Sequence, residues 1–263
     1  MRLHRILAIT RRHWWMIMRD YEWWVHIFYW PLLDIMLWGY FAQSNCVNTP
    51  TTCNTTLYAL VAGAIFWNMV TRANYGISIQ LIEEVEGHNF INLFVTPLTL
   101  SEWFAGVVLL SSAIATVLYI FCMGVVYPLY GVNLFAWGWV LIPFGVALFC
   151  AGLWIGLCAS ILILLWGRRM QSLAYMFGYL FAPLSGIFYP ITVLPLWAQK
   201  IAYALPMVHV FDALRIYVET GTIAIDLLIK TVVLGIFYGA IALSCCILAF
   251  RYTHRRGLVR LYE

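Results

Sequence analysis

Residues 103–167 read WFAGVVLLSSAIATVLYIFCMGVVYPLYGVNLFAWGWVLIPFGVALFCAGLWIGLCASILILLWG and contain no Asp, Glu, Lys or Arg. A helix needs about 20 apolar residues to cross a hydrocarbon layer of about 30 Å. The stretch is long enough for two crossings, and Tyr130-Gly131-Val132-Asn133 offers a turn near its middle. It therefore predicts two membrane helices, near 105–128 and 135–166.

The composition of the whole chain agrees with a lipid environment. Its 263 residues are 64% hydrophobic and only 10% charged, with a mean hydropathy of +0.87. Soluble domains carry about a quarter charged residues, so this chain lacks the charge to cover its own surface in water. The high apolar content also excludes a disordered chain, and seven cysteines are too few for a disulfide scaffold.

Three further charge-free stretches, 35–71, 170–199 and 231–250, mark the other spans. The predicted fold class is an all-α membrane protein with six transmembrane helices. We expect them near 23–42, 57–80, 105–128, 135–166, 171–189 and 226–250.

Basic residues predict the orientation of these spans. Loops on one side are rich in arginine, whereas 43–56 and 129–134 contain neither Lys nor Arg. The arginines are Arg2, Arg5, Arg11, Arg12 and Arg19 before the first span, Arg168 and Arg169 after the fourth, and Arg251, Arg255, Arg256 and Arg260 after the sixth. Basic loops stay in the cytoplasm, which predicts a multi-pass protein of the inner (plasma) membrane with both termini cytoplasmic.

Residues 1–20 show helical periodicity but no apolar run of about 7–15 residues before Arg11-Arg12, so they do not resemble a cleaved signal peptide. One apolar stripe runs along this segment: Leu3, Ile6, Leu7, Thr10, Trp14, Ile17, Met18 and Tyr21. The stripe predicts an N-terminal interfacial helix that lies in the plane of the membrane surface. The alternative is a simple anchor for topology.

Two cysteines, Cys46 and Cys53, share the short loop expected outside the membrane. In an oxidising compartment they can form a disulfide that joins the first two spans, and the alternative is two free thiols. No cluster of Cys and His has the spacing of a metal site.

The chain lacks the motifs of a nucleotide site. A phosphate-binding loop needs a Gly-Lys pair, but Lys200 and Lys230 follow Gln199 and Ile229. Neither a G-x-S-x-G elbow nor an H-E-x-x-H helix occurs. Any work driven by ATP therefore requires an ATPase on another polypeptide, and we expect no cofactor in this chain.

Residues 83–102 (EEVEGHNFINLFVTPLTLSE) join the second and third spans. They predict a short helix, Phe90 to Val95, which Asn89 caps and Pro97 ends, and Ser101 is expected to cap the next span. A short helix held at the membrane surface can act as a lever against a cytoplasmic partner. The alternative is that its acidic residues are solvated loop charges.

Residues 183–215 are interrupted by Pro183, Pro190, Pro195 and Pro206. Broken helices are tolerated at membrane depth only where protein or water satisfies the freed backbone groups. The pattern predicts short re-entrant outer helices between spans five and six.

This second segment resembles the S-G-x-x-[FY]-P-x-x-x-L-P … L-P-x-x-H-x-x-D-x-L-R stretch of ABC-2-type permeases, the membrane subunits of ATP-driven exporters. The residues that carry the resemblance are Ser185, Gly186, Pro190, Leu194, Pro195, Pro206, His209, Asp212 and Arg215. The 83–102 segment resembles the coupling-helix region of the same family, although Ile91 stands where many members carry Glu. Length and span count also agree, so the resemblance covers 1–263 as a single transmembrane domain.

The resemblance implies a transport subunit that is not itself an enzyme. Two copies of this chain would pair as a homodimer above two copies of a cytoplasmic ABC ATPase, which would bind ATP and Mg. Coupling to them would fall to Glu83, Glu84, Glu86, Asn89, Phe90 and Leu93. The cargo would be amphipathic or lipid-linked: a lipo-oligosaccharide, a polysaccharide or a drug-like molecule. An intramembrane enzyme using Asp34, His209 or Asp212, or a passive channel, is the alternative.

Several residues inside the expected spans are candidates for the translocation path. Asp34 either contacts cargo or is hydrogen-bonded within the bundle, because an unpaired charge in lipid is costly. Trp30, Tyr40 and Trp67 either stack on cargo or belong to the interfacial aromatic belts. Arg72 is expected to snorkel to headgroups. The motifs Gly152-x-x-x-Gly156 and Gly235-x-x-x-Gly239 are more typical of packing inside a bundle than of a dimer seam.

Overall fold

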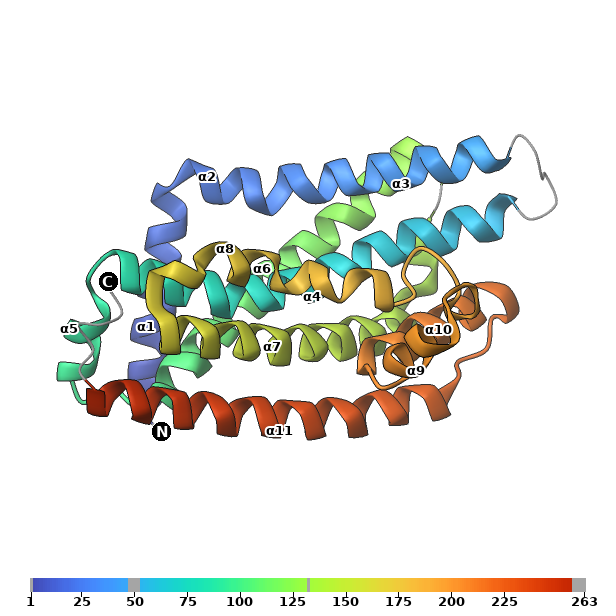
Figure 1. Cartoon of the computed structure of the whole chain (residues 1–263). Helices are drawn as coiled ribbons and strands as arrows, with labels where there is room; N and C mark the ends of the chain where they lie inside the picture. The colour runs from blue at the N-terminus through green and yellow to red at the C-terminus, as the bar shows by residue number, and fades with distance from the viewer. Residues whose placement is uncertain (1, 47–52, 132, 257–263) are drawn as a thin grey trace.

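The computed structural model describes residues 2–46, 53–131 and 133–256, and throughout these ranges the secondary structure is helical, without a strand. Long helices run side by side (Figure 1). They are α3 (Trp30–Cys46), α4 (Cys53–Glu86), α6 (Leu100–Tyr130), α7 (Leu141–Trp166) and α11 (Ile225–Arg256). The prediction of an all-α protein is confirmed for the described residues.

Three helical segments are long and apolar enough to cross a membrane: Leu100–Tyr130, Trp137–Trp166 and Ile225–Arg255. They correspond to the spans predicted near 105–128, 135–166 and 226–250. α9 (Leu196–Tyr203) and α10 (Pro206–Thr220) form a pair bent by 96°. If this pair is counted as one span, the number of such segments is four. The protein is therefore a membrane protein.

The first two predicted spans also form long helices, although they are less apolar. Residues 23–42 lie in a continuous helical run of α2 (Tyr21–Trp24), a π-helical turn (Val25–Tyr29) and α3. Residues 57–80 lie within α4, which buries polar side chains inside the bundle. They are Asn68, Thr71, Arg72, Asn74, Ser78, Gln80 and Glu84. A helix enclosed by protein does not need an apolar surface, which explains how α4 can carry them.

The helix predicted over 171–189 is shorter than expected. α8 spans Gln171–Leu180 and is followed by a short 3-10 helix, Ala182–Leu184. Pro183 lacks the backbone N–H that would continue the helix. Gly186 then takes a left-handed conformation with φ of 74°. Ten residues rise only about 15 Å, about half of the hydrocarbon layer.

The centre of the core is α4, which packs against α7, α6 and α3. α7 approaches it closely at two glycines. A Cβ atom on Gly152 would lie 2.3 Å from the carbonyl oxygen of Val70, and one on Gly156 would lie 3.0 Å from that of Asn74. The expectation that Gly152-x-x-x-Gly156 serves packing inside the bundle is confirmed. Gly235 and Gly239 on α11 have nothing within 4 Å of such a Cβ.

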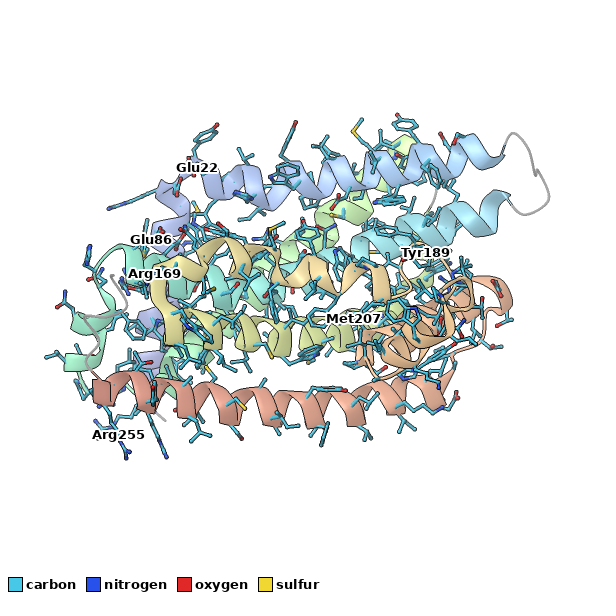
Figure 2. All side chains as sticks on the ribbon, in the orientation of Figure 1. Glu22, Glu86, Arg169, Tyr189, Met207 and Arg255 are labelled. Atoms are coloured by element: carbon cyan, nitrogen blue, oxygen red, sulfur yellow. The ribbon has the colours of Figure 1, made fainter. Side chains whose placement is uncertain are left out.

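The two ends of the bundle differ. At one end, which we call the junction end, α1 (Leu3–Arg19) runs crosswise to the long helices, close to α5 (Phe90–Val95) and the end of α11 (Figure 1). α9 and α10 lie at the opposite end. Glu86, Arg169 and Arg255 all lie at the junction end (Figure 2). The segments predicted to share one side of the membrane therefore share one end of the molecule.

We expect Gly152→Ala to lower the stability of the protein by about 1–3 kcal/mol, because a backbone carbonyl of α4 occupies the space of the new methyl group. The matched control is Gly235→Ala, whose methyl group meets nothing and whose helix propensity improves. Thermal unfolding of both variants in detergent tests this. Equal melting temperatures for the two variants would contradict the close packing of α4 on α7.

Candidate functional site

The junction end brings together four segments: the last turn of α4, α5, the first turn of α6, and α1. α4 ends through backbone hydrogen bonds from Gly87 to Glu83, from His88 to Val85 and from Asn89 to Glu84. His88 takes the left-handed conformation at this end, with φ of 54°. The chain thus turns sharply from α4 into α5.

Glu84, predicted to couple to a partner, is instead buried against α1. Only 1% of its side chain is exposed. The guanidinium group of Arg12 donates to both of its carboxylate oxygens, at 2.5 and 2.9 Å. This bidentate arrangement is the strongest geometry for a pair of these groups. Glu84 therefore joins α4 to α1 rather than presenting its charge to a partner.

His13 lies beside this ion pair, with its Nε2 atom 3.4 Å from Glu84. Burial, and then the neighbouring charge of Arg12, lower the pKa of His13 to about 4. The imidazole is therefore neutral at physiological pH. Its ring packs edge-on against Trp103 of α6, with the ring centroids 6.1 Å apart. His13 is not a member of the apolar stripe predicted for 1–20, so the sequence pattern does not predict its burial.

Glu83 makes the second link between α4 and the N-terminal region. It accepts a hydrogen bond of 2.9 Å from the indole nitrogen of Trp23. Burial is the main cause that raises the pKa of Glu83 to about 7; the hydrogen bond from Trp23 opposes it, and the negative charges of Asp20, Glu84 and Glu86 add to it. Glu86, the third acidic residue, is exposed.

The predicted short helix Phe90–Val95 is confirmed as α5. Phe90 is fully buried and packs on Phe250 of α11, with the ring centroids 6.2 Å apart. Asn89 occupies the N-cap position, but its side chain makes no capping hydrogen bond, so that prediction is wrong. Leu93 is partly buried, whereas Val95 is 81% exposed. Phe90 therefore anchors α5 to the bundle, and Val95 lies on its exposed surface.

The start of α6 is capped by Thr99, not by the predicted Ser101. Thr99 and Glu102 form a reciprocal capping box. Glu102 also accepts a hydrogen bond of 2.8 Å from the backbone N–H of Arg2 and pairs with Arg5 at 3.4 Å. A capping box needs a Glu three residues after the cap. Glu102 stands at that distance from Thr99 and not from Ser101.

α1 therefore holds both helices that flank α5. Thr10 donates to the carbonyl oxygen of Gly106 on α6 at 3.1 Å, while Arg12 holds α4. The predicted apolar stripe of α1 divides into two faces. Ile17 is buried against the bundle. The exposed members are Leu3, Leu7, Trp14, Met18 and Tyr21.

The candidates for a translocation path do not converge on one surface. Trp67 is buried in the core, whereas Trp30 and Tyr40 are exposed on the outside of the helical run. Tyr40 packs edge-on against Tyr130, with the ring centroids 5.5 Å apart. Asp34 is partly buried, on the side of its helix that faces Asn68 of α4. Both interpretations of Asp34, as a contact for cargo and as a residue satisfied within the bundle, stay predictions.

Arg72 does not snorkel to headgroups as expected. Its side chain is buried, and it donates to the backbone carbonyl of His26 in the π-helical turn at 3.0 Å. Its Nε atom has no partner among the described residues. Both polar atoms of the Asn74 side chain are also buried without a partner there. The polar residues within 57–80 are the feature of the sequence from which a protein-enclosed helix could have been predicted.

At the opposite end, the motif residues form a network of local hydrogen bonds. Arg215 donates to the carbonyl oxygen of Gly186 at 2.8 Å and pairs with Asp212 at 3.3 Å. The Nε2 atom of His209 lies 3.1 Å from the carbonyl oxygen of Tyr203. Ser185, which is buried, donates to Ala182 at 2.7 Å. Asp212 therefore pairs with Arg215 on one face of α10, and His209 bonds within its own segment.

The prolines of the motif begin its short helices. Pro190 precedes the 3-10 helix Ile191–Val193, and Pro195 precedes α9. Pro206 is the first residue of α10, and its carbonyl oxygen accepts a hydrogen bond of 3.2 Å from Thr231. The carbonyl oxygen of Leu194 accepts one of 2.7 Å from Gln199. These contacts position the segment.

The predicted disulfide concerns Cys46 and Cys53, whose side chains lie outside the described part of the structure. It stays a prediction. Among the described cysteines, Cys122, Cys150, Cys158, Cys245 and Cys246 are free thiols.

The family model for ABC-2 type transporters matches residues 4–218, most of the chain, and the protein belongs to this family. Family members are membrane components of transporters that work with an ATP-binding subunit. No curated protein matches the chain.

We expect Arg12→Met to destabilise the protein by about 2–3 kcal/mol, because it leaves the buried carboxylate of Glu84 without its cation. Removing both charges in Arg12→Met/Glu84→Met restores part of this loss, which a double-mutant cycle on melting temperatures measures. Arg11→Met, which changes an exposed neighbour, is the control. Additive effects of the two substitutions would contradict the ion pair.

Glu83→Gln tests the electrostatics of the junction through pH. The folded-state pKa of about 7 lies above the ordinary value of 4.5, so Glu83 contributes stability at low pH that is lost as pH rises between these values. Gln keeps an oxygen for Trp23 and carries no charge. We expect equal stability near pH 4 and an advantage of about 1–2 kcal/mol for the variant at pH 8.

Melting temperatures across this pH range measure the difference. Glu86→Gln, which removes a carboxylate at an exposed position of the same turn, is the matched control. A constant offset for Glu83→Gln at every pH would contradict the raised pKa.

Proposed function

We propose that this chain is the permease subunit of an ABC exporter, which moves an amphipathic or lipid-linked molecule outward across the inner membrane. A separate ATPase subunit hydrolyses ATP, with its Mg, and drives the movement. The observation that carries the proposal is the way α5 is held. It joins the two long helices α4 and α6, and α1 binds both of them.

The same contacts support α5 as the coupling helix. Phe90 fastens α5 to α11, and the ion pair of Arg12 with Glu84 fixes the turn of α4 that leads into it. Because packed helices have discrete arrangements, a push on α5 moves α4, α6 and α1 as a unit. In this proposal Glu84 and Phe90 transmit force inside the chain. The contact with the ATPase uses the exposed side chains of Glu86, Asn89, Asn92 and Val95.

The proposed membrane placement has six spans. The run from Tyr21 to Cys46, α4, and α8 with the turns that follow it join the three clearly apolar helices. The junction end faces the cytoplasm, since arginines concentrate there. α1 lies at the interface, with Leu3, Leu7 and Trp14 toward lipid. α9 and α10 form the re-entrant outer segment.

Two copies of the chain pair in this proposal, and the cargo passes along their seam. Exposed aromatic residues on the first helical run, among them Trp30 and Tyr40, are available to that seam. Asp34 lies on the same run, one turn after Trp30, and is only partly buried. Trp67 is not part of the path in this proposal, because it is buried in the core of a single chain.

We expect Val95→Asp to abolish capture of the ATPase and cargo-stimulated ATP hydrolysis while the protein still inserts and folds. A charge on an 81% exposed side chain disturbs a docking surface without disturbing the core. Val193→Asp is the matched control, because Val193 is 71% exposed at the opposite end. Co-purification with the ATPase and hydrolysis in reconstituted vesicles are measured.

Two results would contradict the proposal at different levels. An unchanged, active ATPase complex with Val95→Asp would remove α5 as the docking element. Transport by the purified chain alone in liposomes without nucleotide would indicate a passive channel and overturn the exporter itself. Catalysis by the isolated chain would do the same in favour of an intramembrane enzyme.

A further inference from the structure

A large hollow lies between α7 and α11 at the junction end, on the outside of the bundle. Its volume is about 840 Å³. The walls combine aliphatic and aromatic side chains with two arginines. They are Ile161, Leu165, Trp166, Cys245, Leu248, Ala249, Arg251, Tyr252 and Arg255. We call this hollow the α7–α11 groove.

The floor of the groove is fixed. Thr253 on α11 donates a hydrogen bond of 2.6 Å to the carbonyl oxygen of Leu164 on α7. Cys246, on the buried side of α11, is fully buried in the core. Ala249 is buried with only a methyl group, which leaves room above it. The groove is therefore a preformed depression between two packed helices.

The two arginines of the groove have no anionic partner among the residues that line it. Arg251 and Arg255 stand four residues apart on one face of α11, and the described lining contains no Asp or Glu. Like charges at this spacing repel each other. The end of a helix carries only about half a negative charge, which is too little to balance two guanidinium groups. The site favours an anion.

The rest of the groove is apolar and reaches into the membrane. α11 is one of the apolar spans, and the groove extends from Arg255 back to Cys245. Ten residues of α-helix rise about 15 Å, which is about the depth of one leaflet. Trp166 and Tyr252 line the groove near the arginines, where aromatic side chains favour the level of the headgroups. Charge at the rim and an apolar wall one leaflet deep match a single phospholipid.

We propose that the α7–α11 groove binds an anionic phospholipid of the leaflet at the junction end. Arg251 and Arg255 hold the headgroup phosphate. An acyl chain lies along Leu248, Leu165 and Cys245. The site is peripheral to α5 and does not depend on the coupling proposed above, because none of its lining residues belongs to α4, α5 or α6.

The test is lipid binding to the purified full-length chain in neutral detergent, followed by native mass spectrometry. The probes are phosphatidylglycerol and phosphatidylcholine with the same acyl chains, and inorganic phosphate as competitor. We expect phosphatidylglycerol to bind more tightly than phosphatidylcholine. Arg251→Gln/Arg255→Gln should weaken phosphatidylglycerol binding about thirtyfold, since each arginine near the surface contributes about a factor of five.

A second variant tests the apolar half of the groove. Cys245 is exposed, so Cys245→Trp fills the groove without entering the core and should weaken the binding of both lipids. Arg169→Gln is the control. It removes an exposed arginine from the same end of the molecule, outside the groove, and should leave lipid binding unchanged.

Three outcomes would overturn the proposal. Phosphatidylglycerol binding that is unaffected by either groove variant would place the lipid elsewhere. Displacement of the lipid by inorganic phosphate would reduce the site to a surface anion site. A change in the oligomeric state of Cys245→Trp, with lipid binding intact, would show that a second copy of the chain covers the groove.

Discussion

The constraint on which this structure depends is the polar side of α4. Lipid offers no hydrogen-bond partners, so a helix with Asn68, Arg72 and Asn74 in its middle must be enclosed by other helices. α3, α6 and α7 provide this enclosure. The close approach of α7 at Gly152 follows from it, because a side chain there would hold the two backbones apart. The π-helical turn before α3 also gains a role, since its His26 carbonyl accepts the hydrogen bond of Arg72. The peripheral helix α11 is apolar and needs no such enclosure, so most of its span is exposed on the outside of the bundle.

The enclosure of α4 continues at the junction end by electrostatic means. Here α4 emerges from the bundle with three acidic residues; α1 covers Glu84, and Trp23 of α2 contacts Glu83. Arg12 neutralises Glu84, whereas Glu83 receives only the indole N–H of Trp23. The two carboxylates therefore differ in character. Glu84 belongs to a satisfied ion pair, and Glu83 is strained by burial among like charges, which raises its pKa to about 7. The charged contacts of α1 thus tie it to both helices that flank α5.

The sequence predicts the parts of this arrangement that depend on composition and local pattern. The charge-free stretch 103–167 leads to α6 and α7, and Pro97 and the preceding apolar residues lead to α5. Contacts between distant segments escape it. Nothing local distinguishes Glu84 from Glu86, yet one is buried under Arg12 and the other is exposed. His13 is not a member of the apolar stripe, and its burial is not predictable from local sequence because Trp103, which packs on it, lies far along the chain. The family motif around Arg215 is recognisable in the sequence. The hydrogen bond from Arg215 to the carbonyl oxygen of Gly186 is visible only in the fold.

The two ends of the bundle are held by different kinds of bond, and this difference bears on how the protein moves. At the opposite end, charged and polar side chains bind backbone carbonyls within one short segment, as Arg215 binds Gly186 and Gln199 binds Leu194. Such bonds fix a local shape and offer nothing to an outside partner. At the junction end, ion pairs cross between α1 and the helices that flank α5. In the proposed function, the ATPase docks at this end and acts on the helices that these pairs join, so the rearrangement starts at α1 and α5. The segment around α9 and α10 then follows as a unit whose local shape is already fixed.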